Sequence, residues 1–157
     1  MTQRIPLEIW HSCRNQFVIL DCRDGNCPPM NALFRLAESL CASPIADDLL
    51  VLQDAKGADV RLRVLGGDGR EGDLCGNGLL CTADKLGNEL GGREIRVETA
   101  SGLRTASRKN GTWSVEIGPA SILEDDFAAM DDGLRRELPL YGLVRAGEPH
   151  LAVSYTH

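Results

Sequence analysis

The segment from residue 78 to residue 86 constrains the fold more than any other part of the chain. It has the spacing of a helix, and that helix is apolar or small almost all round, at Leu79, Leu80, Cys81, Ala83 and Leu86. A helix of this kind is normally buried on every side rather than laid on a surface. The rest of the chain must therefore supply the elements that enclose it.

Short runs rich in β-branched and aromatic residues, separated by turn signals, predict those elements. Predicted strands cover residues 5–10, 16–20, 49–53, 60–65, 95–99, 103–107, 113–117, 143–145 and 151–155, and a first helix covers 30–41. The last two strands are expected to be separated by a loop at residues 147–150, and residues 124–132 to form a connector. Many strands around one buried helix predict an α+β or barrel-like fold rather than a regular strand–helix alternation.

Composition argues against several classes of function. The 157 residues carry a net charge of −6 and only 4% aromatic residues, without a cluster of Lys and Arg, so we expect no nucleic-acid partner. No apolar run approaches the ~20 residues of a membrane helix, and residues 1–10 lack the apolar block of a signal peptide. We therefore expect a cytoplasmic protein without a membrane partner. The six cysteines form no C-x-x-C pair, which favours free thiols and no metal site.

The sequence Cys75-Gly76-Asn77-Gly78 stands at the expected start of the buried helix. A cysteine there faces free backbone N–H groups and the positive end of the helix dipole, and both favour the reactive thiolate. The glycines let a substrate approach the backbone closely, and the same N–H groups can bind a carboxylate. These residues alone leave two interpretations open. The motif is either a combined base and anion-binding site, or an inert core cysteine in a glycine-rich helix start.

Four segments of the chain resemble, in order, the diaminopimelate epimerase family of PLP-independent amino-acid epimerases. Residues 63–81 read RVLGGDGREGDLCGNGLLC and are similar to the family block R-I-F-N-A-D-G-S-E-x-x-x-C-G-N-G-x-R-C. Residues 15–21, 47–50 and 147–150 are similar to its Gly-Asn-Asp-Phe opening, its Asp-Gln/Gly-Leu-Leu segment and its Gly-Asn-Pro-His segment. The resemblance implies two similar lobes, each a mixed sheet rolled around a central helix, with the active site between them.

The resemblance also implies a mechanism that uses no cofactor. Each lobe of the family supplies one cysteine at the start of its central helix; one thiolate removes the α-proton, and the other thiol protonates the opposite face. Cys75 is implied to be one of the two. Gly76 and Asn77 are implied to bind the amino-acid substrate through the helix N-terminus, and Asn15 to contact it from the opening loop. Glu148 occupies a further substrate-contacting position.

Three positions depart from the family pattern. Gly66 and Glu148 stand where the family has asparagines that touch the substrate, and Leu80 stands where it has an arginine. Gly66 removes an amide, and Glu148 replaces one with a carboxylate. The implied chemistry is unaffected, but the substrate is expected to be an amino acid other than diaminopimelate, with a basic side chain.

The resemblance covers the first lobe and the start of a second. We expect residues 1–118 to form the first lobe and 119–157 a connector and an incomplete second lobe. No second Cys-Gly motif occurs, so the active enzyme is expected to need the missing second lobe or a second subunit, and this chain alone to be inactive. The alternatives are a non-catalytic lobe that binds an amino acid or another protein, and an isomerase similar to the carboxylate-using phenazine-biosynthesis isomerases. The cysteine motif argues against the latter.

The remaining residues of chemical interest have structural interpretations. Glu71 is expected to orient its loop by hydrogen bonds, Asp47 and Asp48 to form a solvated turn, and His150 to fix a turn. Trp10 and Trp113 are expected to lie in the core. Core or surface thiols are expected at Cys13, Cys22, Cys27 and Cys41.

Overall fold

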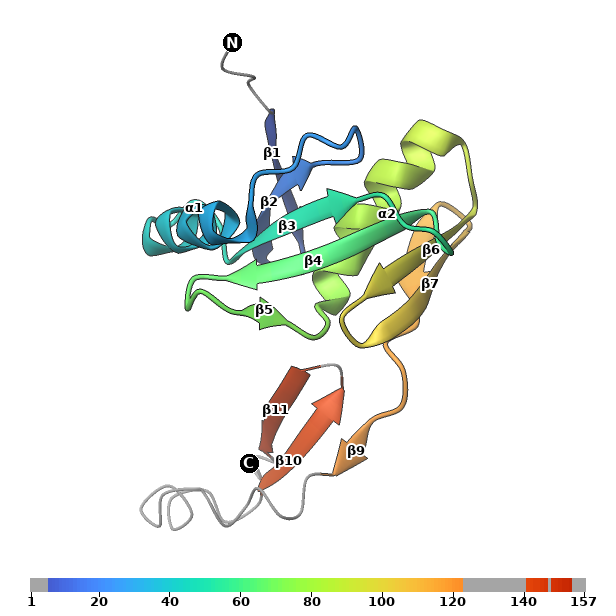
Figure 1. Cartoon of the computed structure of the whole chain (residues 1–157). Helices are drawn as coiled ribbons and strands as arrows, with labels where there is room; N and C mark the ends of the chain where they lie inside the picture. Colours follow the sequence, from blue (N-terminus) through green and yellow to red (C-terminus); the bar gives the residue numbers. More distant parts are fainter. Residues whose placement is uncertain (1–5, 123–140, 147, 154–157) are drawn as a thin grey trace. The chain divides into compact units, whose positions relative to one another are not determined.

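The structure is a computed structural model, and it describes residues 6–122, 141–146 and 148–153 (Figure 1). The chain divides into two compact units, Met1–Glu116 and Ile117–His157, which are described separately. The assignment of residues 119–157 to a connector and second lobe stays a prediction.

The first unit contains an eight-stranded sheet and two helices. Its elements are β1 (Leu7–Ser12), β2 (Asn15–Asp21), α1 (Met30–Ala42), β3 (Asp48–Gln53), β4 (Val60–Gly66), β5 (Glu71–Gly72), α2 (Gly76–Leu90), β6 (Glu94–Thr99), β7 (Gly102–Lys109) and β8 (Thr112–Val115). The strand order is β1-β2-β3-β4-β6-β7-β8, with β5 added to β4. The pairs β2–β3 and β4–β6 are parallel and the others antiparallel, so the sheet is mixed. Each parallel pair is joined through a helix, as such a crossover requires.

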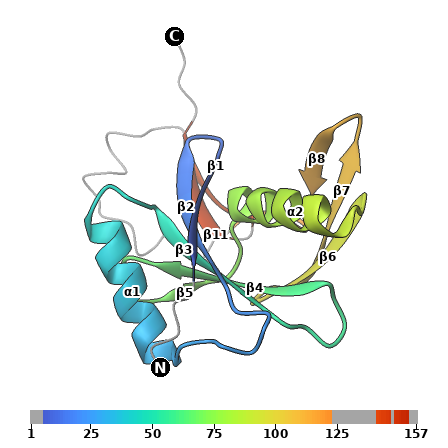
Figure 2. The ribbon, with the colours of Figure 1, turned by 90° about the horizontal axis from the view of Figure 1, so that it is seen from above.

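The two helices lie on opposite faces of the curled sheet (Figure 2). Alternate residues of β2 and β3 face one helix or the other. One core cluster includes Phe17, Ile19, Leu50, Leu52 and residues of α2. The other includes Val18, Leu20, Leu49, Val51 and residues of α1. Burial on both faces explains why residues 17–20 and 49–52 are continuous apolar runs.

Helix α2 is the predicted buried helix. Leu79, Cys81, Ala83 and Leu86 are at most 3% exposed, and strands β1, β4, β6, β7 and β8 pack against the helix. The expectation of an α+β fold, with a mixed sheet rolled around a central helix, is confirmed. Gly91 ends the helix in a left-handed conformation, with a φ of 67°.

The turn between β1 and β2 has an unusual backbone. The strands pair up to Ser12 and Asn15, so only Cys13 and Arg14 form the loop. Both have left-handed φ angles, of 51° and 72°. A two-residue hairpin turn of this kind usually contains glycine or asparagine, because other residues are strained there. The turn places Asn15 at the first position of β2.

The second unit contains a three-stranded antiparallel sheet, in the order β11-β10-β9. Its strands are β9 (Ser121–Ile122), β10 (Tyr141–Ala146) and β11 (Glu148–Val153). The predicted loop at 147–150 is therefore wrong for residues 148–150, which belong to β11. Pro149 pairs with Arg145 there, and a proline is tolerated because β11 is an edge strand of this sheet. The predicted connector at 124–132 and Gly147 lie outside the described residues.

Candidate active site at the start of helix α2

Cys75 is the N-cap residue of α2. Its backbone is extended, with φ −116° and ψ 109°, and its Sγ accepts a hydrogen bond from the backbone N–H of Gly78 at 3.4 Å. The Cys75 carbonyl accepts the first helical hydrogen bond, from Leu79, at 2.9 Å. The sulfur thus lies against the amide end of the helix, where a thiolate gains a charge-assisted hydrogen bond and a favourable interaction with the dipole.

A close contact between α2 and β3 fixes this helix start. A Cβ added to Gly78 would lie 3.0 Å from Leu50 Cδ2 and 3.5 Å from the Cys75 Cβ. The absence of a side chain at Gly78 therefore lets the first turn of α2 approach the sheet. Cys75 itself is half-buried and packs against the core cluster around α2. The residue therefore rests on apolar side chains and is only partly covered.

Asn15 and Asn77 come together beside this cysteine, although they lie 62 residues apart in the chain. The Asn77 side-chain amide donates to Asn15 Oδ1 at 2.6 Å, and Asn15 Nδ2 donates to Asp47 Oδ2 at 3.3 Å. Because a carboxylate can only accept, Asp47 requires the Asn15 nitrogen to face it, which leaves the Asn15 oxygen for Asn77. Asp47 also accepts from the backbone N–H of Gln16, at 2.7 Å.

Sequence reasoning missed this role of Asp47. The residue lies in an exposed bend, as predicted, but its carboxylate anchors the start of β2 instead of being merely solvated. Asp48, its predicted partner in the turn, is the first residue of β3. The only signal was the resemblance of residues 47–50 to a family segment, which did not indicate what the carboxylate binds.

The loop before Cys75 is held by an ion pair. Arg63 Nη1 lies 2.6 Å from Glu71 Oε2, and Arg63 Nε donates to Gln53 Oε1 at 3.0 Å. Glu71 makes the hydrogen bond that was predicted for it, but from strand β5 rather than from a loop.

The structure brings together four of the five predicted site residues: Cys75, Gly76 and Asn77 at the start of α2, and Asn15 at the start of β2. Glu148 is the first residue of β11, in the second unit, and its side chain lies outside the described residues. Gly66 is the last residue of β4. A Cβ there would lie 3.0 Å from Asp68 Oδ1 and 3.7 Å from Asp48 Oδ1, so two carboxylates flank this position.

Three other thiols are held in their protonated form. Burial raises the pKa of Cys22 to about 12, with the neighbouring Cys27 adding to the effect. Burial likewise raises the pKa of Cys81 to about 11, helped by the charge of Cys75. Burial and the carboxylates of Asp48 and Asp47 raise the pKa of Cys41, whose Sγ also lies 3.1 Å from the Asp47 carbonyl oxygen. These thiols are poor nucleophiles and bases at neutral pH.

An ionic cluster that the sequence did not predict supports the second half of α2. Lys85 is only 8% exposed, and its Nζ lies 2.7 Å from both Glu8 Oε1 and Glu89 Oε1 and 3.9 Å from Asp21 Oδ2. Arg23 pairs with Asp21 and Glu89. The spacing of Lys85 and Glu89, four residues apart on one helix, was the only sequence signal. The cluster joins α2 to β1 and to the end of β2.

Within residues 6–122, 141–146 and 148–153, no three His, Cys, Asp or Glu side chains gather in a way that could hold a metal ion. No helix in the described part of the chain is long and apolar enough to cross a bilayer.

Residues 9–123 match the family model described as diaminopimelate epimerase. The chain belongs to this family. Over 130 residues it is 34% identical to the diaminopimelate epimerase of Rhodospirillum centenum, covering 80% of this chain and 45% of that protein. Over 163 residues it is 30% identical to the diaminopimelate epimerase of Archaeoglobus fulgidus, and the match covers 96% of this chain and 58% of that protein. The chain therefore spans about half the length of the curated relatives it matches.

Solved structures of more distant proteins share the fold of this family member. A hydroxyproline epimerase from Agrobacterium vitis superposes with a TM-score of 0.64 at 16% identity, covering 94% of this chain and 51% of its own. A phenazine biosynthesis protein of the PhzF family from Bacillus anthracis superposes with a TM-score of 0.62 at 18% identity. The superposition covers 94% of this chain and 53% of that protein. At this identity the likeness establishes the fold alone.

Proposed function

We propose that this chain is the first lobe of a cofactor-independent racemase or epimerase that inverts the α-carbon of a free amino acid, with Cys75 as one of its two acid/base groups. The observation that carries the proposal is the Cys75 sulfur on the backbone N–H of Gly78, at the start of the buried helix α2. The relatives named diaminopimelate epimerase support the reaction class.

The site offers the two functions that removal of an α-proton requires. The thiolate of Cys75 accepts the proton, and negative charge then moves from the α-carbon onto the substrate carboxylate. Backbone N–H groups at the start of α2 stabilise charge that develops there. Gly76 leaves the approach open, and the Asn15–Asn77 pair offers polar groups to the substrate. In the reverse direction, the Cys75 thiol returns a proton to the same face.

Inversion needs a second group on the opposite face of the α-carbon. Of the two described helices, only α2 has a cysteine at its N-cap; α1 has Pro29 there. We propose that the opposite group is a second cysteine, supplied by a second lobe beyond these residues or by another subunit.

The deciding experiment is hydrogen exchange with the full-length protein in deuterated water. We expect a single α-deuterium in the inverted product, and a loss of at least about 1,000-fold in Cys75→Ala. Cys27→Ser is a matched control, because Cys27 lies in the loop after β2 rather than at the start of α2. Unchanged exchange in Cys75→Ala would refute the mechanism. Amino-acid binding without any exchange would identify a non-catalytic binding lobe instead.

We propose further that the substrate has a basic side chain. Glu148 introduces a carboxylate where the family resemblance places an amide, and Gly66 removes a second amide. Carboxylates near a closed site favour a cationic partner, because an uncompensated buried charge is costly. A panel of lysine, arginine, ornithine and histidine should be turned over faster than LL-diaminopimelate, and Glu148→Gln should reduce that preference. A clear preference for diaminopimelate would contradict the proposal.

A further inference from the structure

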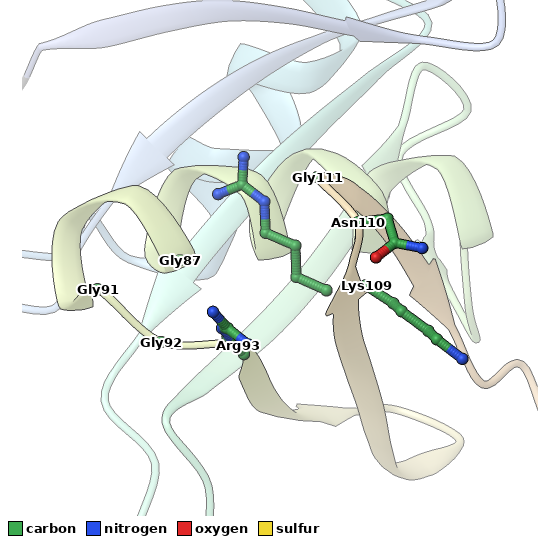
Figure 3. A pocket seen from close by; sticks show the side chains of 8 residues that line it. Gly87, Gly91, Gly92, Arg93, Lys109, Asn110 and Gly111 are labelled. Atoms are coloured by element: carbon green, nitrogen blue, oxygen red, sulfur yellow. The ribbon is translucent and has the colours of Figure 1, made fainter.

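A hollow of about 520 Å³ lies at the end of α2 that is remote from Cys75 (Figure 3). Its walls come from the last turn of the helix, from Gly91 to Arg93 after it, and from the turn between β7 and β8. A helix of 15 residues is about 22 Å long, so the hollow is separate from the candidate active site.

Among the described residues, the lining carries three cations, Arg93, Arg108 and Lys109, and no carboxylate. None of the ion pairs found among the described residues includes any of the three. Arg108 lies over the Trp113 ring, 5.7 Å from its centroid, and donates to Asn88 Oδ1 at 3.3 Å, so both partners are neutral. This gathering of positive charge is notable in a chain whose net charge is −6.

The helix end does not account for that charge. The C-terminus of a helix carries about half a negative charge, whereas the lining residues carry three full positive ones. Of the carboxylates on α2, Asp84 accepts the Trp113 indole N–H at 3.0 Å, and Glu89 pairs with Lys85 and Arg23. The hollow therefore keeps an excess of positive charge and is suited to an anion.

The glycines of the lining leave the backbone open to a ligand. Gly91 and Gly111 have left-handed φ angles of 67° and 83°, and a Cβ added to either would meet no atom within 4 Å. Figure 3 shows Arg93 between the end of α2 and the β7–β8 turn, with Lys109 extending outward at the rim. The main-chain N–H of Arg108 bonds to the Arg93 carbonyl at 2.7 Å, which joins the two arginine-bearing segments.

We propose that this hollow binds the phosphate group of a small phosphorylated molecule. Planar guanidinium groups such as those of Arg93 and Arg108 donate paired hydrogen bonds to phosphate oxygens, and accessible glycine backbones allow close approach. The volume lies in the range of small-molecule sites and exceeds what a bare phosphate fills. The site is independent of the chemistry proposed for Cys75.

Trp113 provides the readout, because it lies beside Arg108 and only one other tryptophan, Trp10, is present. In a Trp10→Phe background, ribose 5-phosphate should give a saturable change in fluorescence and raise the melting temperature, while sodium chloride at equal ionic strength should not. Arg93→Gln should weaken binding at least tenfold, and Lys109→Gln less, because it lies at the rim.

Lys56→Gln is the matched control, since it removes the same charge from an exposed position on another turn and should leave binding unchanged. Inorganic phosphate and ribose itself serve as separate arms: binding of phosphate but not ribose supports the phosphate site, and tighter binding of the ester shows that the organic part contributes. No saturable response up to the millimolar range, or equal affinity in Arg93→Gln, would overturn the proposal.

Discussion

The reactivity that we propose for Cys75 rests on its place at the start of α2, where its Sγ accepts the backbone N–H of Gly78. We predict that iodoacetamide at neutral pH labels Cys75 ahead of Cys41 and Cys81, whose thiols are held protonated by burial and nearby negative charge. Peptide mass spectrometry on the isolated chain measures the order directly. Slower labelling of Cys75 than of Cys81 would mean that the helix start does not activate it.

We propose that Asp47 is a positioning residue that acts on the substrate through Asn15. In the full-length enzyme, Asp47→Ala should lower kcat/KM about tenfold or more, because Asn15 loses the carboxylate that fixes its amide. The rate of Cys75 alkylation in the isolated chain should stay unchanged, which separates a local effect from unfolding. The control Asp54→Ala removes an exposed carboxylate elsewhere and should leave kcat/KM unchanged. An unchanged kcat/KM in Asp47→Ala would rule out the role.

At the scale of single residues, the sequence was informative where the candidate residues form one short, continuous motif. A helix-start argument pointed to Cys75 and the glycines after it, and the family resemblance added the role predicted for Asn77. The bond between Asn77 and Asn15, and the anchoring of Asn15 by Asp47, depend on how β2, β3 and α2 pack. Lys85 was missed for the same reason, because its three acidic neighbours come from separate elements.

At the scale of elements, the packing of α2 against β8 depends on Gly87. A Cβ at this position would overlap with the ring of Trp113. Gly87→Ala should therefore lower the free energy of unfolding by up to about 2 kcal/mol, because the overpacking cost of about 1–3 kcal/mol is offset by a gain in helix propensity of only about 1 kcal/mol. Urea unfolding checks this. Gly57→Ala, at a turn where a Cβ meets nothing within 4 Å, should change stability by less than about 0.5 kcal/mol. Equal effects would contradict the packing argument.

The ionic cluster that links α2 to β1 and β2 should make stability depend on acid pH. Hydrogen bonds with Lys85 and Arg23 lower the pKa of Glu8 and Asp21 below their ordinary values of 4.5 and 3.8. The folded state therefore binds fewer protons than the unfolded state in this range. The stabilisation is complete above about pH 5 and is lost as the pH falls through the lowered pKa values.

Lys85→Met tests the cluster. The substitution should lower the free energy of unfolding by about 1–3 kcal/mol at pH 7. This is less than the loss of a fully buried ion pair, because the side chains of Glu8 and Glu89 are 40% and 38% exposed. The difference from the wild type should shrink below about pH 4, when the carboxylates become protonated. Lys56→Met is the control. A difference that is independent of pH would indicate lost packing rather than lost charge.

The elements themselves were predictable where a run of residues was long enough to show a pattern. Helix α1 was predicted from its helical spacing, α2 from its small and apolar residues, and the longer strands from runs rich in β-branched and aromatic residues between turn signals. Strands β5 and β9 have two residues each, too few for any alternation to show. The loop predicted at residues 147–150 was wrong at 148–150 because proline usually ends a strand, and the sequence did not show that β11 would lie at a sheet edge.

At the scale of the whole molecule, the chain supplies one proposed proton-transfer group, and inversion requires two. We predict that purified residues 1–157 bind substrate weakly, do not racemise it, and at most exchange the α-proton slowly with retention of configuration. Circular dichroism of the amino acid and deuterium incorporation measure the two outcomes. Racemisation by the purified chain would contradict the prediction and support a homodimer that places two copies of Cys75 on opposite faces of the substrate.

The hairpin turn at Cys13 and Arg14 has a consequence for protein engineering. Two residues with side chains hold left-handed φ angles there, each at a cost of about 1 kcal/mol or more. An Asn-Gly pair adopts the same geometry with little strain. The turn is thus a place where thermostability can be increased without altering the core, and the neighbouring Asn15 requires that the two-residue loop length be kept.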